Sequence, residues 1–586
     1  MIRLRALLLA AALAAPAAPA FATDARSPAP TSLPSELSAS ERTLYREVFA
    51  AIDAGDWAGA SARLDAAPEG LLHNAARTEL YLAKGSPKVE LSQLVSLIEK
   101  APQLPKAEQL SRLAVTRGAT SLPDLPQAQN LVWVGSQPRR ERAKGTKGDA
   151  AADALELLVQ PLLKDNRPYE AEALFLERQE QLGPEARTEF QQRLGWSYYT
   201  IGDDRDARRL SAAARAGSGD WAIQGAWAEG LAAWRSGDCR GAGEAFRTVT
   251  ERSRDVEMIA AAHYWSARAE MMCARPEQVQ GHLRAAARQK ETFYGMLAAS
   301  ALGMQGSAAA GLHDYRDAEW RGVASKPNVR TAIALAEIGR EDLADQFIRH
   351  QARIGSPGEH GALLHLAAEM NLASTQYWLA HNAPRGVAVN IAARYPRPDW
   401  RPTRGWRVDP ALAFAHTLQE SSFRTGVVSP AGAVGLMQVR PGTAGDIARA
   451  RGEAFDRQML TTPAANIEFG QSYIESLRDN PATGGLLPKV IAAYNAGPVP
   501  VAEWNTRRFD KGDPLLYIES LPYWETRGYV PIVLRNYWIY EEELGKEAGS
   551  REALVQGMWP RFPGLPGARA VRVAEKGSGT PTGGTD

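Results

Sequence analysis

Apolar residues recur at helical spacing along most of the chain, whereas the alternating pattern of strands is scarce. Between about residues 38 and 305, Ala, Leu, Glu and Arg dominate, and Gly-Asp pairs interrupt the helical pattern. Two of these turns, at Gly202 and Gly237, lie 35 residues apart. Such a period is typical of stacked helix pairs that bury their apolar faces against one another. The pattern therefore predicts an all-α protein that begins with an α-superhelix.

Changes in composition predict further divisions of the chain. We assign residues 23–325 to the superhelix and residues 326–395 to a smaller helical linker domain. A proline-rich stretch at 395–402 marks the boundary to a third helical unit, residues 396–548. Residues 560–586 are rich in Gly, Pro, Arg and Thr with little apolar periodicity, so we expect this tail to be disordered.

The third unit contains a carboxyl group in an unusual position. Asp409 and Pro410 are suited to the first positions of an apolar helix whose last turn holds Glu420. A loop rich in Gly, hydroxyl and amide groups follows. The carbonyl end of a helix and apolar neighbours both disfavour an ionised carboxylate. We therefore expect a raised pKa for Glu420, as a general acid requires near neutral pH.

The amino terminus has the pattern of a secretory signal peptide over residues 1–22, with Arg3 and Arg5 before an Ala/Leu-rich core. Pro16 and Pro19 and the short apolar run argue against a membrane anchor. No later apolar run is long enough to cross a bilayer, so we expect an exported mature protein without an integral membrane segment. The formal net charge of +1 gives no electrostatic argument for nucleic acid binding.

The cysteine content limits the chemistry that the chain can perform. Cys239 and Cys273 are the only two cysteines, and they can form a disulfide in an oxidising compartment or remain as two buried thiols. Two cysteines, and nine histidines without a ligand-like cluster, predict no metal site.

Four separated blocks of sequence carry a family resemblance. They are Glu420-Ser421 with Ser429 beyond it, Gly435-Leu436-Met437-Gln438, the AYNAGP run that starts at Ala493, and the ETRGYV run that starts at Glu525. In this order they resemble the soluble lytic transglycosylases, lysozyme-like enzymes that cleave peptidoglycan in the periplasm. The resemblance covers about 110 residues and implies a lysozyme-like catalytic domain at 396–548, seated on a ring or horseshoe of superhelix.

The resemblance also implies a mechanism with one carboxyl group. Most glycosidases use two carboxylates, but the next acid after Glu420 is Asp446, beyond the loop and in another predicted helix. Glu420 is expected to protonate the oxygen between N-acetylmuramic acid and N-acetylglucosamine, and then to deprotonate the muramic C6 hydroxyl, which closes a 1,6-anhydro ring. The implied partner is the glycan strand of peptidoglycan, with no cofactor. We expect a periplasmic monomer that also meets cell-wall remodelling proteins.

Further residues are expected to bind the substrate. Ser429 and Gln438 match cleft positions of the family, and the Tyr494 hydroxyl is expected close to the catalytic carboxyl or the N-acetyl group. Glu525 is expected to hold substrate or to stabilise positive charge on the reacting sugar. Arg440 departs from the family pattern, which usually has Met there. The full set of substrate-binding candidates is Ser429, Gln438, Arg440, Ala493, Tyr494, Asn495 and Glu525.

Simpler interpretations remain open for several of these residues. Ser429 suits a turn before Pro430, Asn495 suits a helix cap, and Glu525 suits an ion pair with Arg527 or Arg535. Aromatic residues between 504 and 529 suit a sugar-binding cleft, although most of them are expected in the core. For the whole protein, the alternatives are a goose-type lysozyme that uses water, or a non-catalytic scaffold that binds peptidoglycan.

Overall fold

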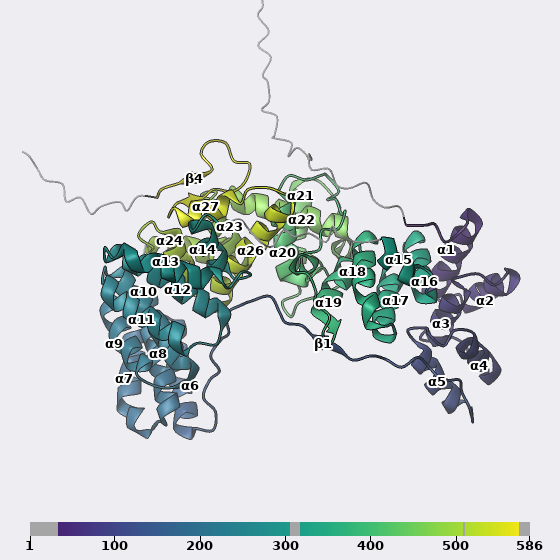
Figure 1. Ribbon diagram of the computed structural model, residues 1–586, viewed down its shortest axis with the longest axis horizontal. Coiled ribbons are helices and arrows are strands. Elements are labelled where there is room, and N and C mark those ends of the chain that lie inside the picture. The colour runs from purple at the N-terminus through teal and green to yellow at the C-terminus, as the bar shows by residue number, and fades with distance from the viewer. Residues whose placement is uncertain (1–32, 305–316, 508–509, 574–586) are drawn as a thin grey trace, which may run out of the picture.

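The computed structural model describes residues 33–304, 317–507 and 510–573, and the predicted signal peptide therefore lies outside the described residues. Within them the chain forms twenty-seven α-helices and four very short strands, so the predicted all-α class is confirmed (Figure 1). No helix in these three ranges has both the length and the apolar character needed to cross a membrane.

Two separate groups of helices precede the C-terminal domain. The first group contains α1 (Ala39–Asp53), α2 (Trp57–Ala66), α3 (His73–Leu82), α4 (Leu91–Lys100) and α5 (Ala107–Thr116). The second contains α6 (Ala150–Lys164), α7 (Pro168–Arg178), α8 (Pro184–Ile201), α9 (Asp204–Arg215), α10 (Gly219–Arg235), α11 (Cys239–Arg252), α12 (Val256–Met272), α13 (Pro276–Ala287) and α14 (Phe293–Ala301).

The remaining helices form the linker and the C-terminal domain. The linker contains α15 (Asp317–Ala324), α16 (Pro327–Glu337), α17 (Glu341–Ile354), α18 (His360–Glu369) and α19 (Ala373–His381). The C-terminal domain contains α20 (Pro410–Ser421), α21 (Pro441–Ala450), α22 (Pro463–Arg478), α23 (Leu487–Ala496), α24 (Pro498–Arg507), α25 (Pro514–Glu519), α26 (Trp524–Glu543) and α27 (Gly549–Val555). The short strands are β1 (Leu131–Trp133), β2 (Asn382–Pro384), β3 (Trp559–Pro560) and β4 (Ala570–Val571).

The Gly-Asp turns connect the helix pairs as their sequence predicts. Gly202 ends α8 in the left-handed conformation, with φ of 90°, and the Asp203 side chain accepts a hydrogen bond from the Asp206 amide at the start of α9. Asp238 caps α11 in the same way through Gly241. Glycine tolerates positive φ, and aspartate satisfies a free amide at a helix start. The two residues together therefore stop one helix and begin the next.

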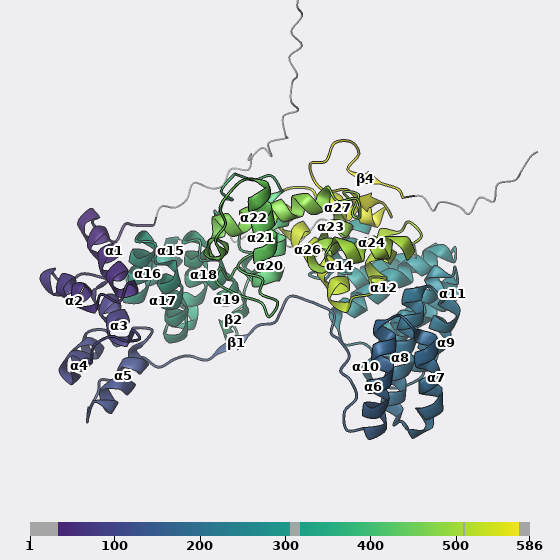
Figure 2. The ribbon, with the colours of Figure 1, turned by 180° about the vertical axis from the view of Figure 1, so that it is seen from behind.

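The predicted superhelix at 23–325 is not continuous in the structure. Helices α1–α5 share a hydrophobic core with the linker helices, whereas α6–α14 share a core with the C-terminal domain. Figures 1 and 2 show these two groups at opposite ends of an elongated molecule. Residues 117–149 run between them without an α-helix, and β1 in this segment pairs antiparallel with β2 at the end of the linker. Prolines such as Pro123 and Pro126 prevent this segment from continuing the helical stack.

The described part of the predicted disordered tail is folded. β3 and β4 pair antiparallel, the Phe562 side chain is buried, and the Phe562 amide donates to the Gly485 carbonyl over 2.8 Å. The expectation of disorder is therefore wrong for residues 560–573, because a few apolar side chains anchor a segment that lacks helical periodicity. Residues 574–586 lie outside the described residues.

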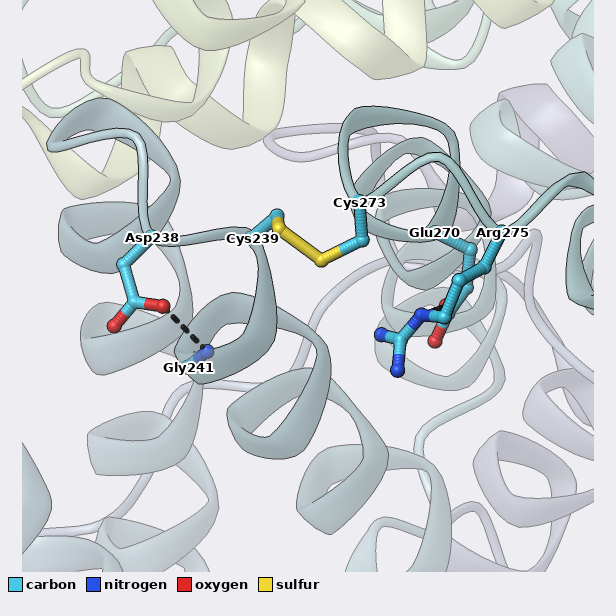
Figure 3. The surroundings of a disulfide bond; sticks show 6 residues. All are labelled: Asp238, Cys239, Gly241, Glu270, Cys273 and Arg275. Carbon is cyan, nitrogen blue, oxygen red and sulfur yellow. Dashed lines mark hydrogen bonds and ion pairs between the residues drawn. A yellow bond between two sulfur atoms is a disulfide. The ribbon is translucent and has the colours of Figure 1, made fainter.

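A disulfide joins two neighbouring helices of the second group. Cys239 at the start of α11 and Cys273 just after α12 have their Cα atoms 5.5 Å apart and are bonded through sulfur (Figure 3). The Glu270–Arg275 ion pair lies beside it. Of the two alternatives that the sequence leaves open, the structure therefore has the disulfide, which ties consecutive helix pairs together.

Removal of this disulfide should lower stability measurably. Because the bond closes a loop with a sequence separation of 34, the double variant Cys239→Ser/Cys273→Ser should lose about 2–4 kcal/mol of unfolding free energy. Chemical denaturation of the oxidised protein and the variant checks this. The reduced wild type is the control and should match the variant. Equal stability of the oxidised protein and the variant would contradict the prediction.

Candidate active site

Helix α20 places Glu420 at the edge of the C-terminal domain. The Asp409 side chain accepts a hydrogen bond from the Ala411 amide over 2.9 Å, and Pro410 occupies the first turn, as predicted. Most side chains of the helix are buried, and α20 packs against α26. The helix ends at Ser421, and Ser422 caps it in the left-handed conformation with φ of 51°. Glu420 therefore lies in the last turn of the helix and is partly exposed.

Glu420 is held by a tyrosine of α26. The Tyr529 hydroxyl donates a hydrogen bond to Glu420 Oε1 over 2.6 Å. Burial raises the pKa of Glu420 to about 7, the hydrogen bond from Tyr529 opposes this shift, and the negative charge of Glu525 adds to it. The group is therefore a carboxyl that is half protonated near neutral pH, as the sequence predicts from its place at a helix end.

His416 lies one turn before Glu420 on α20 and contacts the same tyrosine. Its Nδ1 atom is 2.8 Å from the Tyr529 hydroxyl, and its side chain is buried. His416 is not among the residues predicted from the sequence, and Tyr529 is expected only as part of the ETRGYV run and as one of several aromatic residues. The spacing of four residues between His416 and Glu420, which puts both on one helix face, is the signal that could have found the histidine.

The loop after α20 is fastened by Asn466 of α22. The Asn466 amide nitrogen donates to the carbonyls of Val434 and Leu460, and its oxygen accepts from the Met437 amide over 2.8 Å. Gly435 has φ of 76°, and an added Cβ would lie 2.2 Å from the Leu460 carbonyl oxygen, so only glycine fits. The loop conformation is therefore fixed against α22 rather than open.

Ser429 and Gln438 both support this loop. The Ser429 hydroxyl accepts from the Ala433 amide over 3.0 Å, which is the turn role that the sequence left as the alternative. The Gln438 amide nitrogen donates to the carbonyls of Gly435 and Val427. Both residues are partly exposed and lie on the loop that follows Glu420. Their part in substrate binding stays a prediction.

Tyr494 lies close enough to Glu420 to be affected by its charge, but it makes no hydrogen bond to Glu420 in the described structure. Its hydroxyl donates to the Met437 carbonyl over 2.7 Å, and its ring lies 4.5 Å from the His416 ring between centroids. Burial, followed by the negative charge of Glu420, raises the pKa of Tyr494 well above its usual value. Tyr529, rather than Tyr494, makes the hydrogen bond to Glu420, and Tyr494 ties the loop to α23.

Asn495 and Glu525 meet where α23 ends and α26 begins. The Asn495 amide donates to Glu525 Oε1 over 3.3 Å, and its oxygen accepts from the Thr526 hydroxyl over 2.6 Å. Asn495 therefore bridges two helices instead of capping one. The ion pair of Glu525 with Arg527 or Arg535 is not formed, because Arg527 donates to the Leu521 carbonyl and Arg535 approaches Glu257. The Glu525 carboxylate is exposed on the surface.

The last two candidates, Ala493 and Arg440, differ in their exposure. Ala493 is completely buried, and its carbonyl accepts from the Gly497 amide over 2.8 Å, so it offers no contact surface for a substrate. Its expected place among the substrate-binding residues is corrected on this ground. Arg440 precedes α21 and is exposed, and its charge lowers the pKa of Tyr473 against the larger effect of burial, which raises it.

A large cavity adjoins the Glu525 surface. Its volume is about 1200 Å³, and it lies between helices of the second group and the start of α26. Its wall combines aromatic rings with charged groups. Asn495 and Glu525 belong to the part of the wall that the C-terminal domain contributes. Residues that contribute rings or charges to the wall are Arg193, Trp196, Trp221, Trp504, Tyr523 and Trp524.

The C-terminal region of the chain is similar in sequence to known proteins. Residues 401–516 match the family model described as the Transglycosylase SLT domain. A soluble lytic murein transglycosylase of Salmonella typhimurium is 34% identical over 168 residues, which are 28% of this chain and 24% of that protein. The Escherichia coli K12 protein of that name is 37% identical over 148 residues, which are 25% of this chain and 22% of the relative. The chain thus spans about a quarter of the length of these relatives.

Solved structures extend the likeness to the whole fold. The 70 kDa soluble lytic transglycosylase from Escherichia coli has a TM-score of 0.57 at 17% identity, with 89% of this chain and 99% of that chain covered. An inactive mutant of the lytic transglycosylase Slt from Pseudomonas aeruginosa has a TM-score of 0.53 at 19% identity, with 86% of both chains covered. At this identity the structures show the common fold alone. Residues 401–516 therefore contain a Transglycosylase SLT domain, and the chain is similar to soluble lytic murein transglycosylases over the matched region.

Proposed function

We propose that this protein is a lytic transglycosylase that cleaves the β-1,4 bond between N-acetylmuramic acid and N-acetylglucosamine in peptidoglycan. The observation that carries the proposal is the state of Glu420. It is a partly exposed carboxyl whose pKa burial raises to about 7, and it is bound on one oxygen by Tyr529. Such a group is protonated often enough near neutral pH to act as an acid, and its free oxygen, Oε2, is available to a substrate.

In the first step Glu420 Oε2 donates its proton to the glycosidic oxygen. The bond from that oxygen to C1 of the muramic sugar breaks, the N-acetylglucosamine portion leaves as an alcohol, and positive charge develops at C1. The exposed carboxylate of Glu525 is suited to stabilise that charge. Glu420 is left as a carboxylate, which the Tyr529 hydrogen bond stabilises.

In the second step the carboxylate acts as the base. It removes the proton from the muramic C6 hydroxyl, O6 forms a bond to C1, and Glu420 is protonated again. The product is a 1,6-anhydromuramic end. An attack within one sugar ring needs no positioned water, because the nucleophile is already held near C1. One carboxyl therefore suffices for both steps.

The cavity beside Glu525 suits the continuing polymer. Rings such as Trp196 and Trp524 line this cavity, and the apolar surface of such rings suits the C–H faces of sugars. The proposed binding surface therefore includes residues of both the second helix group and the C-terminal domain. The leader pattern at residues 1–22 and the Cys239–Cys273 disulfide support a periplasmic location.

Analysis of the digestion products tests the proposal directly. Purified murein sacculi are incubated with the protein, and the soluble muropeptides are identified by mass spectrometry. A lytic transglycosylase yields anhydro-muropeptides, whereas a goose-type lysozyme yields reducing ends that contain one more water. No release of muropeptides would favour the non-catalytic scaffold.

The pH dependence of activity should follow the protonation of Glu420. Because the acid form is needed first, kcat/KM should fall about tenfold per pH unit above about pH 7. Glu525→Gln removes a charge that raises the Glu420 pKa, so this decline should begin at lower pH. Tyr529→Phe removes a hydrogen bond that lowers the Glu420 pKa, so the decline should begin at higher pH. Rates of murein solubilisation across pH for the three proteins check these opposite shifts, and profiles that coincide would contradict them.

A further inference from the structure

A row of three hydrogen-bonding side chains ends at the proposed acid. His416 Nδ1 is 2.8 Å from the Tyr529 hydroxyl, and that hydroxyl is 2.6 Å from Glu420 Oε1. His416 and Tyr529 are buried, and only Glu420 reaches the surface. A hydroxyl has a single proton, so Tyr529 donates to only one of its two neighbours at a time. Whether the Tyr529 proton points to His416 or to Glu420 determines whether Glu420 Oε1 accepts a hydrogen bond from the tyrosine.

The surroundings of His416 favour one direction. Its Nε2 atom is buried and has no hydrogen-bond partner among the described residues. If Tyr529 donated to Nδ1, the neutral imidazole would carry its proton on Nε2, and a buried N–H donor would be unsatisfied at considerable cost. If Nδ1 carries the proton instead, it donates to the tyrosine oxygen. The tyrosine proton then points to Glu420.

The imidazole stays neutral in this arrangement. Burial lowers the pKa of His416 to about 3. The titratable groups that face the imidazole are Tyr494 on α23, Tyr529 on α26 and Glu420 on its own helix. Glu525 lies one turn before Tyr529, at the start of α26. Its ring also lies 4.5 Å from that of Tyr494 between centroids, which restricts its rotation. The tautomer of His416, rather than its charge, therefore determines which neighbour receives the Tyr529 proton.

We propose that His416 is a positioning residue that directs the Tyr529 proton to Glu420 Oε1 and thereby reserves Oε2 for the proton that is transferred to substrate. The inference rests on the proposed role of Glu420 as the acid. Without His416 the tyrosine hydroxyl is free to turn, and Glu420 protonated on Oε1 can donate to it. In that state the proton points away from the substrate, so a fraction of the enzyme is unproductive.

A double-mutant cycle on kcat distinguishes this role from simple packing. His416→Phe keeps a ring of similar shape but removes the donor, and it should lower kcat about tenfold with little change in KM. If His416 acts through Tyr529, adding His416→Phe to Tyr529→Phe should have no further effect on kcat. Effects that simply multiply would overturn the proposal. His416→Gln, which retains an N–H donor, should recover part of the loss.

A matched control is available on the same helix. Thr417 is buried, and its hydroxyl donates to the Ala413 carbonyl within α20. Thr417→Val should leave kcat unchanged within about twofold, because this bond does not reach Glu420. Melting temperatures of all variants show whether each one is folded before its kcat is interpreted.

The tautomer provides a readout that does not depend on activity. In protein labelled with ¹⁵N-histidine, the His416 signals are identified by their loss in His416→Gln. The ring nitrogen shifts should show a proton on Nδ1 and none on Nε2 at neutral pH. A proton on Nε2 would overturn the inference whatever the products are. Conversely, reducing ends in the muropeptide analysis would remove the transglycosylase proposal while the tautomer result stood.

Discussion

Glu420→Gln is expected to lower murein-lytic activity by a factor of about 10³ or more. The glutamine side chain keeps the size of Glu420 but neither donates an acidic proton nor accepts one, so both proposed steps lose their catalyst. Among the nearby acids, Asp446 is exposed and paired with Arg449, and Glu525 is exposed and bound by Asn495. Neither is placed to replace a half-buried carboxyl with a raised pKa. Release of muropeptides from sacculi, measured over long incubation, checks the loss.

The same variant should be more stable than the wild type at alkaline pH. The folded-state pKa of Glu420 lies above its ordinary value of 4.5, so the folded protein binds more protons between that value and about pH 7. The ionised carboxylate therefore destabilises the native state at pH 8, and glutamine removes this cost. The advantage in melting temperature should shrink toward pH 5. Activity retained by a folded Glu420→Gln protein would exclude Glu420 as the acid.

Arg140→Met should destabilise the protein by about 3–5 kcal/mol. Arg140, in the segment between α5 and α6, makes two hydrogen bonds of 2.6 and 2.7 Å to Glu519, which is fully buried at the end of α25. The Tyr294 hydroxyl of α14 donates to the same carboxylate over 2.7 Å. Loss of the arginine leaves a buried carboxylate without its cation. Unfolding monitored by denaturant titration measures the effect.

Two further variants test whether the loss of stability in Arg140→Met comes from the unpaired Glu519 carboxylate. Arg140→Met combined with Glu519→Leu removes the unpaired charge and should recover most of the stability, because an apolar pair often replaces a buried ion pair without loss. Arg449→Met breaks an exposed pair with Asp446 and should cost less than about 1 kcal/mol. If Arg140→Met were as mild as Arg449→Met, the buried pair would not stabilise the contact between the segment before α6 and the C-terminal domain.

Local features of the site could be predicted from the sequence. The start of α20 follows from Asp409 and Pro410, and the raised pKa of Glu420 follows from its place at the end of an apolar helix. The helix start depends on adjacent residues, so a single stretch of sequence contains the information. For the pKa, the sequence predicts the direction, whereas Tyr529 and Glu525 act on Glu420 from α26. The family blocks also bring the loop after Glu420 and the starts of α24 and α26 into one region.

Features that depend on helix crossings could not be predicted. Tyr494 and Tyr529 are both aromatic residues within family blocks, and only the packing of α20 against α26 brings the Tyr529 hydroxyl to Glu420. The division of the superhelix likewise depends on which core receives the apolar face of each helix, and the helical period is the same in both groups. In the tail, a lone apolar residue such as Phe562 gives no pattern, yet its side chain is buried.

The shared core of the first helix group and the linker has a consequence for biogenesis. Arg42 and Asp53 of α1 pair with Glu337 and Arg340, and the Gln103 carbonyl accepts from Asn328. Helices α1–α5 are thus synthesised first but cannot complete their packing until α15–α19 have followed. The intervening helices α6–α13 pack mainly against close neighbours in sequence, whereas α14 also packs against α26 and α27. Before the linker has been made, the apolar surface of the amino-terminal helices is therefore exposed to chaperones and proteases.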